Sequence, residues 1–155
     1  QVDQWYETDT KKMLDVTSPD NIIVSGRLAN GAVVSVHVAS NPWAGSGYRM
    51  EIYGRKGTLV ATSEDSPQLG EVYLQGAQGT DNLEDITVPD KHTNVLEGMP
   101  KGPPHNVGQL YFQFGAAIRG QSATYPDFDT AVDLHRLIDN IRLASDDGRT
   151  VGTAG

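Results

Sequence analysis

The sequence predicts an α+β fold: a mainly antiparallel open sheet followed by two C-terminal helices packed on one face of that sheet. Three observations support this class. Apolar residues alternate with a period of two in the first part of the chain, and they recur at helical spacing near its end. The two kinds of segment do not interleave, which favours an antiparallel sheet over a parallel one.

The first strand pair is expected at residues 21–29 and 32–40, on either side of Asn30-Gly31. Asn-Gly is the preferred pair in two-residue type I′ turns, because both central residues need a positive φ. Such a turn pairs Leu28 with Val33, Val24 with His37 and Ile22 with Ala39 on one face. The other face then carries Ile23, Val34, Val36 and Val38.

Both faces of this hairpin are apolar in that register, whereas a sheet open to water on one side alternates apolar with polar residues. The face formed by Ile23, Val34, Val36 and Val38 therefore requires a partner: a helix of the same domain, another subunit or a missing domain. Burial of four aliphatic side chains at roughly 1.5 to 3 kcal/mol each contributes about 6 to 12 kcal/mol. These four residues are the expected oligomer interface.

A second hairpin is expected at residues 48–61, where Tyr48, Met50 and Ile52 alternate with polar residues. Gly54 and Gly57 bracket its turn and are expected to supply permissive backbone angles. Further strands are predicted at residues 71–75 and 83–88. Residues 89–104 have turn composition throughout, and long connections of this kind are often functional.

The helical period begins after this connection. The first helix is predicted to start with Asn106 as its N-cap and to end before Gly120, a residue suited to a left-handed C-terminal position. The second is predicted from about Asp129 to Gly148. The position of Asp127 and Asp129 favours a role at the helix start, where an acidic side chain accepts backbone N–H bonds. A pair of carboxylates for acid–base catalysis is the less favoured interpretation.

Composition excludes several classes of function. The chain has 155 residues, which predicts one domain, and its net charge of −8 disfavours nucleic acid as a partner. No cysteine is present, which removes thiolate chemistry and favours a cytoplasmic location. No apolar run approaches the roughly 20 residues that span a bilayer. The sequence therefore predicts a soluble protein with no membrane partner.

The chain begins at Gln1, and its opening residues predict an excised fragment or a processed terminus. We expect residues 1–16 to be a lead-in from a missing upstream part. Residues 17–151 are expected to form the α+β domain, and residues 152–155 a tail.

Motifs for catalysis, cofactors and metals are weak. The segment "GSGYRM" from Gly45 begins like a dinucleotide fingerprint, but it precedes a strand instead of opening a helix, so no cofactor-binding residue is expected here. His37 lies mid-strand on an apolar face, which favours a core histidine over a catalytic one. The histidines lack metal-binding spacing, and we expect neither a catalytic residue nor a metal site.

Trp43, Tyr48 and Arg49 differ from these motifs. An aromatic residue on a Gly/Pro-rich loop, beside a Tyr and an Arg at a strand entrance, is typical of the lining of sugar or polyol sites. A role in an interface or in packing of the loop is the alternative. These three residues are the expected substrate-binding set.

Several stretches carry a family resemblance: "SPDNIIVSGRLANGAVVSVHVAS", "YRMEIYGRKGTLVA", "HNVGQLYFQFGAAIRG" and "PDFDTAVDLHRLIDNIRLASDDGR". Over about residues 17–151 the chain resembles the C-terminal domain of the glucose-fructose oxidoreductase/inositol dehydrogenase (Gfo/Idh/MocA) family. The resemblance implies an α+β domain whose open sheet carries substrate and subunit contacts, and hence a homo-oligomer. It also implies a missing N-terminal Rossmann domain that binds NAD or NADP.

The family's catalytic E-K-P and D-x-x-x-H motifs do not occur in this sequence, so none of their roles passes to a residue here. The resemblance therefore implies a substrate-binding and oligomerisation domain of an NAD(P)-dependent oxidoreductase acting on a sugar or polyol, without catalysis by this chain alone. The alternative is a sugar- or protein-binding regulator of the same fold.

Overall fold

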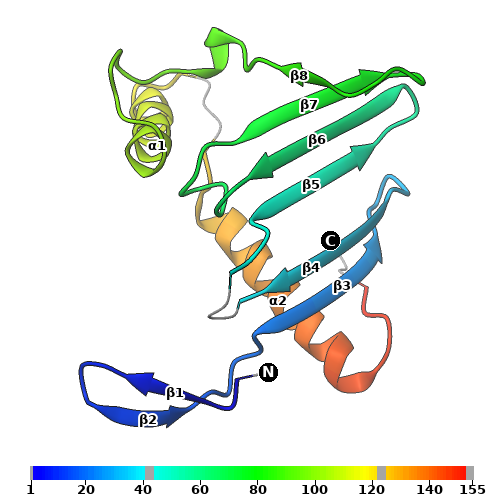
Figure 1. The fold of residues 1–155 in the computed structure, drawn as a ribbon, viewed down its shortest axis with the longest axis vertical. Coiled ribbons are helices and arrows are strands. Elements are labelled where there is room, and N and C mark those ends of the chain that lie inside the picture. Colours follow the sequence, from blue (N-terminus) through cyan, green and yellow to red (C-terminus); the bar gives the residue numbers. More distant parts are fainter. Residues whose placement is uncertain (1, 41–43, 122–124, 153–155) are drawn as a thin grey trace. The chain divides into compact units, whose positions relative to one another are not determined.

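The computed structural model describes residues 2–40, 44–121 and 125–152. Strands and helices follow the predicted order, every strand pair is antiparallel, and the α+β class is confirmed (Figure 1). The chain divides into two compact units, one of residues 1–44 with 132–155 and the other of residues 45–131. The elements are β1 (Gln4–Glu7), β2 (Lys12–Asp15), β3 (Asn21–Arg27), β4 (Val33–Ala39), β5 (Tyr48–Tyr53), β6 (Gly57–Ser63), β7 (Tyr73–Gln78), β8 (Glu84–Ile86), the 3-10 turn η1 (Asp90–His92), α1 (Pro103–Ile118) and α2 (Phe128–Asp147).

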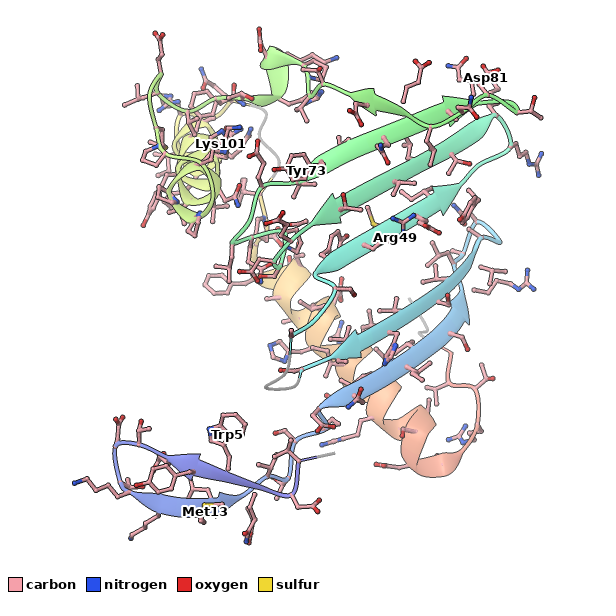
Figure 2. All side chains as sticks on the ribbon, in the orientation of Figure 1. Trp5, Met13, Arg49, Tyr73, Asp81 and Lys101 are labelled. Carbon is pink, nitrogen blue, oxygen red and sulfur yellow. The ribbon has the colours of Figure 1, made fainter. Side chains whose placement is uncertain are left out.

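The β1–β2 hairpin is an element that the sequence analysis does not predict. Trp5 pairs with Leu14 and Tyr6 with Met13, so each face of the hairpin carries one large apolar pair. Figure 2 labels Trp5 and Met13 on the two strands, and both side chains are more than half exposed. Each strand has only four residues, which is too short for a period of two to stand out.

The β3–β4 hairpin is confirmed, but its predicted register is wrong by one residue. Leu28 donates to the carbonyl of Ala32, and the connecting loop holds three residues, 29–31, instead of two. Gly31 has a φ of 87°, whereas Asn30 does not enter the positive-φ region that a type I′ turn requires of it. The strands therefore pair Ile22 with Val38.

The shifted register changes which side chains share a face. Val34, Val36 and Val38 lie on one face with Ile22 and Val24, whereas Ile23 lies on the opposite face, beside His37. The predicted four-residue interface is therefore divided between two faces, and only one face is continuously apolar. The Ile23 face is mixed: Ile23 and Val33 are 79% and 73% exposed among Asn21, Ser25, Arg27, Ser35 and His37.

The exposed position of His37 corrects the expectation of a core histidine. In the predicted register, this residue shared a face with Leu28, Val24 and Ile22. In the observed register its neighbour across the strands is Ile23, on the more exposed of the two faces. The wrong turn length thus led to the wrong face for His37.

Strands β5 to β8 form a four-stranded sheet in sequential order (Figure 1). Its centre lies on β6, where Val60 and Ala61 are only 3% and 6% exposed. Strands β5 and β7 pair with β6 along its two edges, and their side chains flank those of β6. Successive side chains point to opposite faces of a strand. One face, called the polar face below, carries Arg49, Glu51, Tyr53, Thr58, Val60, Thr62, Tyr73, Gln75 and Asp85; the other, the apolar face, carries Met50, Ile52, Leu59, Ala61, Leu74 and Ile86.

The turn between β5 and β6 corrects the expected role of its glycines. Neither Gly54 nor Gly57 has a positive φ, so permissive backbone angles are not the reason for them. A Cβ atom on Gly57 would lie 2.1 Å from the carbonyl oxygen of Ala77. Gly57 is therefore needed for the close approach of β7.

Helix α1 begins four residues earlier than predicted, at Pro103, with Gly102 instead of Asn106 as its N-cap. Pro at the first helical position fits there because its missing N–H would have no partner inside the helix. Asn106 lies within the helix, where its side-chain amide donates to the carbonyl oxygen of Gln68 at 3.0 Å. The helix ends at Ile118, and Gly120 has the predicted left-handed conformation, with a φ of 72°.

Helix α2 starts at Phe128 and ends at Asp147, close to the predicted bounds. The Asp127 carboxylate accepts hydrogen bonds from the backbone N–H and the hydroxyl of Thr130, both at 2.8 Å. These bonds lower the pKa of Asp127, with the backbone bond contributing most. Asp127 thus has the predicted helix-start role, and Gly148 follows the helix with a φ of 61°.

Candidate functional site

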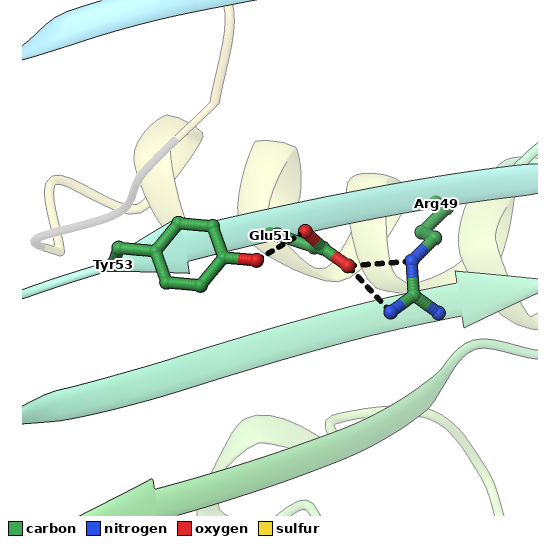
Figure 3. A network of polar contacts seen from close by, with 3 residues as sticks. All are labelled: Arg49, Glu51 and Tyr53. Carbon is green, nitrogen blue, oxygen red and sulfur yellow. Dashed lines mark hydrogen bonds and ion pairs between the residues drawn. The ribbon is translucent and has the colours of Figure 1, made fainter. Parts of the chain in front are cut away.

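Three polar side chains of β5 meet on the polar face. Arg49, Glu51 and Tyr53 alternate along the strand, which places all three on the same side (Figure 3). The Arg49 Nε donates to Glu51 Oε1 at 2.6 Å, and its Nη2 pairs with the same oxygen. The Tyr53 hydroxyl donates to Glu51 Oε2 at 2.5 Å. Each oxygen of the Glu51 carboxylate therefore has its own partner.

These contacts shift the pKa of two of the groups. The hydrogen bond from Tyr53, followed by that from Arg49, lowers the pKa of Glu51 from its ordinary 4.5. The same Tyr53–Glu51 bond raises the pKa of Tyr53 above 10.0. At neutral pH the network therefore consists of a guanidinium, a carboxylate and a neutral phenol, all on one rigid strand.

Replacing Tyr53 with Phe is expected to raise the pKa of Glu51 toward 4.5, because it removes the largest cause of the lowering. A carboxyl whose pKa is lower in the folded state stabilises the fold above its unfolded-state pKa, and that contribution is lost as the pH falls through the folded-state value. NMR titration of the Glu51 side chain measures the shift directly.

Tyr73→Phe is the matched control, since Tyr73 lies on the same polar face but does not contribute to the lowering of the Glu51 pKa. The Glu51 titration is expected to be unchanged in this variant. Equal shifts in the two variants would contradict the assigned hydrogen bond.

The rest of the polar face is a hydrogen-bonding surface. Glu51, Val60, Gln75 and Asp85 form one row across the four strands. The Gln75 amide donates to the Asp85 carboxylate at 2.9 Å, and Val60 is covered between Glu51 and Gln75. A surface with donors and acceptors over an apolar centre can bind a polyhydroxylated molecule or another polar protein surface.

The structure separates two of the three residues predicted to bind substrate, Tyr48 and Arg49. Trp43 lies outside the described residues. Tyr48 and Arg49 are neighbours in β5, so their side chains are on opposite faces, and Tyr48 pairs with Ser63 at the edge of the apolar face. The two cannot line one site on this sheet. Sequence reasoning missed Glu51 and Tyr53 as partners of Arg49, although their spacing of two places them on its side.

The apolar face contains a hollow of about 840 Å³ near the β5–β6 and β7–β8 turns. Leu59, Gly76 and Ile86 form part of its lining, and a Cβ on Gly76 would lie 2.5 Å from Ile86 Cδ1. Lys56 and Asp81, the latter labelled in Figure 2, are also among its lining residues. Neither Tyr48 nor Arg49 is among its lining residues.

The glycine-rich segment at residues 45–50 leads into β5, as predicted, and not into a helix. Gly47 has a φ of 77°, and a Cβ there would lie 2.2 Å from the carbonyl oxygen of Ser63. The segment therefore serves the approach of two backbones, and its geometry does not fit a dinucleotide, whose pyrophosphate needs a helix N-terminus.

In the part of the chain that the structure describes, no three His, Asp or Glu side chains gather closely enough to hold a metal ion. Neither described helix combines the length and the apolar content needed to cross a membrane.

Known proteins resemble the chain over all or part of its length. A family model described as "Oxidoreductase family, C-terminal alpha/beta domain" matches residues 2–153. An uncharacterized oxidoreductase of Synechocystis sp. is 35% identical over 57 residues, which cover 37% of this chain and 15% of that protein. The aligned part is thus a small fraction of that relative's length. No solved structure matches the chain.

Proposed function

This chain belongs to the oxidoreductase family as its C-terminal alpha/beta domain, and we propose that it is the substrate-binding and oligomerisation domain of an NAD(P)-dependent oxidoreductase acting on a sugar, a polyol or a related small molecule. The family match over residues 2–153 carries this proposal. Hydride transfer is the chemistry of the nicotinamide cofactor, which an N-terminal Rossmann domain of the parent protein binds. The chain alone is therefore not catalytic. The absence of cysteine from the sequence favours a cytoplasmic parent.

The polar face supports the substrate-binding part of the proposal. Arg49, Glu51 and Tyr53 present a cation, a carboxylate and a phenol on one strand, and these groups suit a ligand with several hydroxyls. Arg49 is fixed by its bonds to Glu51, which reduces the entropy lost when a ligand binds. Trp43 remains a proposed contact from its sequence context, whereas Tyr48 is left out because its side chain is on the other face.

The Ile23 face of the β3–β4 hairpin supports the oligomerisation part. Ile23 and Val33 are the most exposed aliphatic residues of this hairpin, and Arg27 and His37 share their face. Exposed apolar patches rimmed by polar residues mark interfaces between proteins, and Ile23 and Val33 would supply the apolar contacts of such a surface here. We therefore assign the interface to this face, and Val34, Val36 and Val38 to the opposite one.

Replacing Arg49 with Ala in the full-length parent is expected to raise the KM for its sugar or polyol substrate about tenfold, because a hydrogen bond to a charged group contributes about 1.5 kcal/mol or more. The KM for NAD or NADP is expected to stay unchanged. Steady-state kinetics with each substrate varied in turn measure both values.

Arg55→Ala is the matched control, since Arg55 lies in the β5–β6 turn and lines the hollow on the apolar face. Its sugar KM is expected to equal that of the wild type. An unchanged KM in Arg49→Ala would remove the polar face from the substrate site. Sugar binding by a parent that turns over no substrate would instead support the regulatory module.

A further inference from the structure

Trp5 lines a hollow of about 400 Å³ in the unit that contains the β1–β2 hairpin. Its side chain is about half exposed, which is unusual for the largest aromatic residue. Val2, Val16 and Pro19 are the apolar residues around it, and Ser18, Asp20 and Ser40 are the polar ones. The volume falls within the range of small-molecule sites, about 300 to 1,000 Å³.

Hydrogen bonds join the three chain segments that surround this hollow. The N–H of Val2 donates to Asp20 Oδ2 at 2.7 Å, and the N–H of Ser40 donates to the Asp20 carbonyl at 2.7 Å. The N–H of Val16 donates to the Asp3 carbonyl at 2.9 Å, which continues the β1–β2 ladder past Trp5. The hollow is therefore built before any ligand arrives.

The chemistry of the lining points to one class of ligand. An indole ring offers a flat apolar surface that suits the C–H face of a ring-shaped sugar. Ser18 and Ser40 supply hydroxyls that both donate and accept. Hydrogen bonds from Asn21 and then Val2 lower the pKa of Asp20, so this side chain is a carboxylate at neutral pH and disfavours anionic ligands.

We propose that the hollow beside Trp5 is a binding site for a neutral monosaccharide, whose ring stacks on the indole and whose hydroxyls bond to Ser18 and Ser40. This site shares no residue with the polar face and does not depend on the proposed function. Stacking on the Trp5 indole needs a rigid ring, so an open-chain polyol with the same number of carbons binds more weakly.

The chain has two tryptophans, Trp5 and Trp43, which allows a direct test by fluorescence. The Trp43→Phe variant leaves Trp5 as the single indole. Its emission is expected to change saturably with glucose, with a Kd on the order of 1 to 10 mM for a ligand of about a dozen heavy atoms. Sorbitol is expected to bind several-fold more weakly, and inorganic phosphate to have no effect.

Two further variants in the Trp43→Phe background identify the site. Ser18→Ala is expected to weaken glucose binding several-fold, with an unchanged circular dichroism spectrum. Arg49→Ala is expected to leave glucose binding unchanged, which separates this site from the polar face. The proposal is overturned if Trp5 emission does not saturate, if sorbitol matches glucose, or if Arg49→Ala abolishes the signal.

Discussion

Replacing Gly57 with Ala is expected to lower the free energy of unfolding by about 3 kcal/mol, the combined effect of overpacking and of weakened strand hydrogen bonds. The new Cβ would lie 2.1 Å from the Ala77 carbonyl oxygen and 3.1 Å from Gln78 Cα. Both atoms belong to the backbone of β7, which cannot move without disturbing its pairing with β6. Urea unfolding followed by circular dichroism measures the loss.

Gly26→Ala is the matched control, because Gly26 also lies within a paired strand, and a Cβ there meets no atom within 4 Å. This variant is expected to be as stable as the wild type, or more stable by about 0.4 to 1 kcal/mol, because alanine restricts the unfolded chain. A similar loss of stability in both variants would mean that Gly57 matters for strand propensity and not for the approach of β7.

Gly57 shows what the sequence determines and what it leaves open. The alternation of apolar residues is enough to locate the hairpin at residues 48–61, because side chains on one face of a strand recur every two residues. The reason for Gly57 is a contact with β7, a strand some twenty positions away, and such contacts leave no mark on the local pattern. The position was predictable, but its cause was not.

The Asn30-Gly31 turn illustrates the same limit. A two-residue type I′ turn and a three-residue loop ending in a left-handed glycine both accept this pair, and they differ by one residue in register. The structure has the three-residue loop, with Gly31 at a φ of 87° and the Asn30 side-chain oxygen accepting from the Ala32 N–H. The local sequence is compatible with both turns.

The candidate site was predictable in part for a related reason. Arg49 stood out by its chemistry, and the alternation that places Glu51 and Tyr53 on its side is visible in the sequence. The same alternation excludes Tyr48, its direct neighbour in the strand. The start of α1 was predictable too, since the Gly102-Pro103 pair is a stronger start signal than Asn106.

The register of the β3–β4 hairpin leads to a second large effect. Val34→Asp is expected to lower the free energy of unfolding by about 2 to 3 kcal/mol, because it places a charge on a half-buried, continuously apolar face. Ile23→Asp is expected to change it much less, since Ile23 is 79% exposed. Both substitutions carry the same strand-propensity cost, so their difference measures how well each face is covered.

Self-association distinguishes the two faces further. If the Ile23 face joins subunits, Ile23→Asp weakens the oligomer at least about tenfold, since a buried unpaired charge costs more than the 1.4 kcal/mol that a tenfold change in Kd represents. Sedimentation velocity over a range of chain concentrations measures this change while unfolding experiments confirm the intact fold. A wild-type chain that stays monomeric throughout, or an Ile23→Asp variant that associates normally, would refute the assignment. The predicted register put Ile23 and Val34 on one face and would therefore give Ile23→Asp and Val34→Asp similar effects. The observed register puts them on opposite faces, so the two variants are expected to differ.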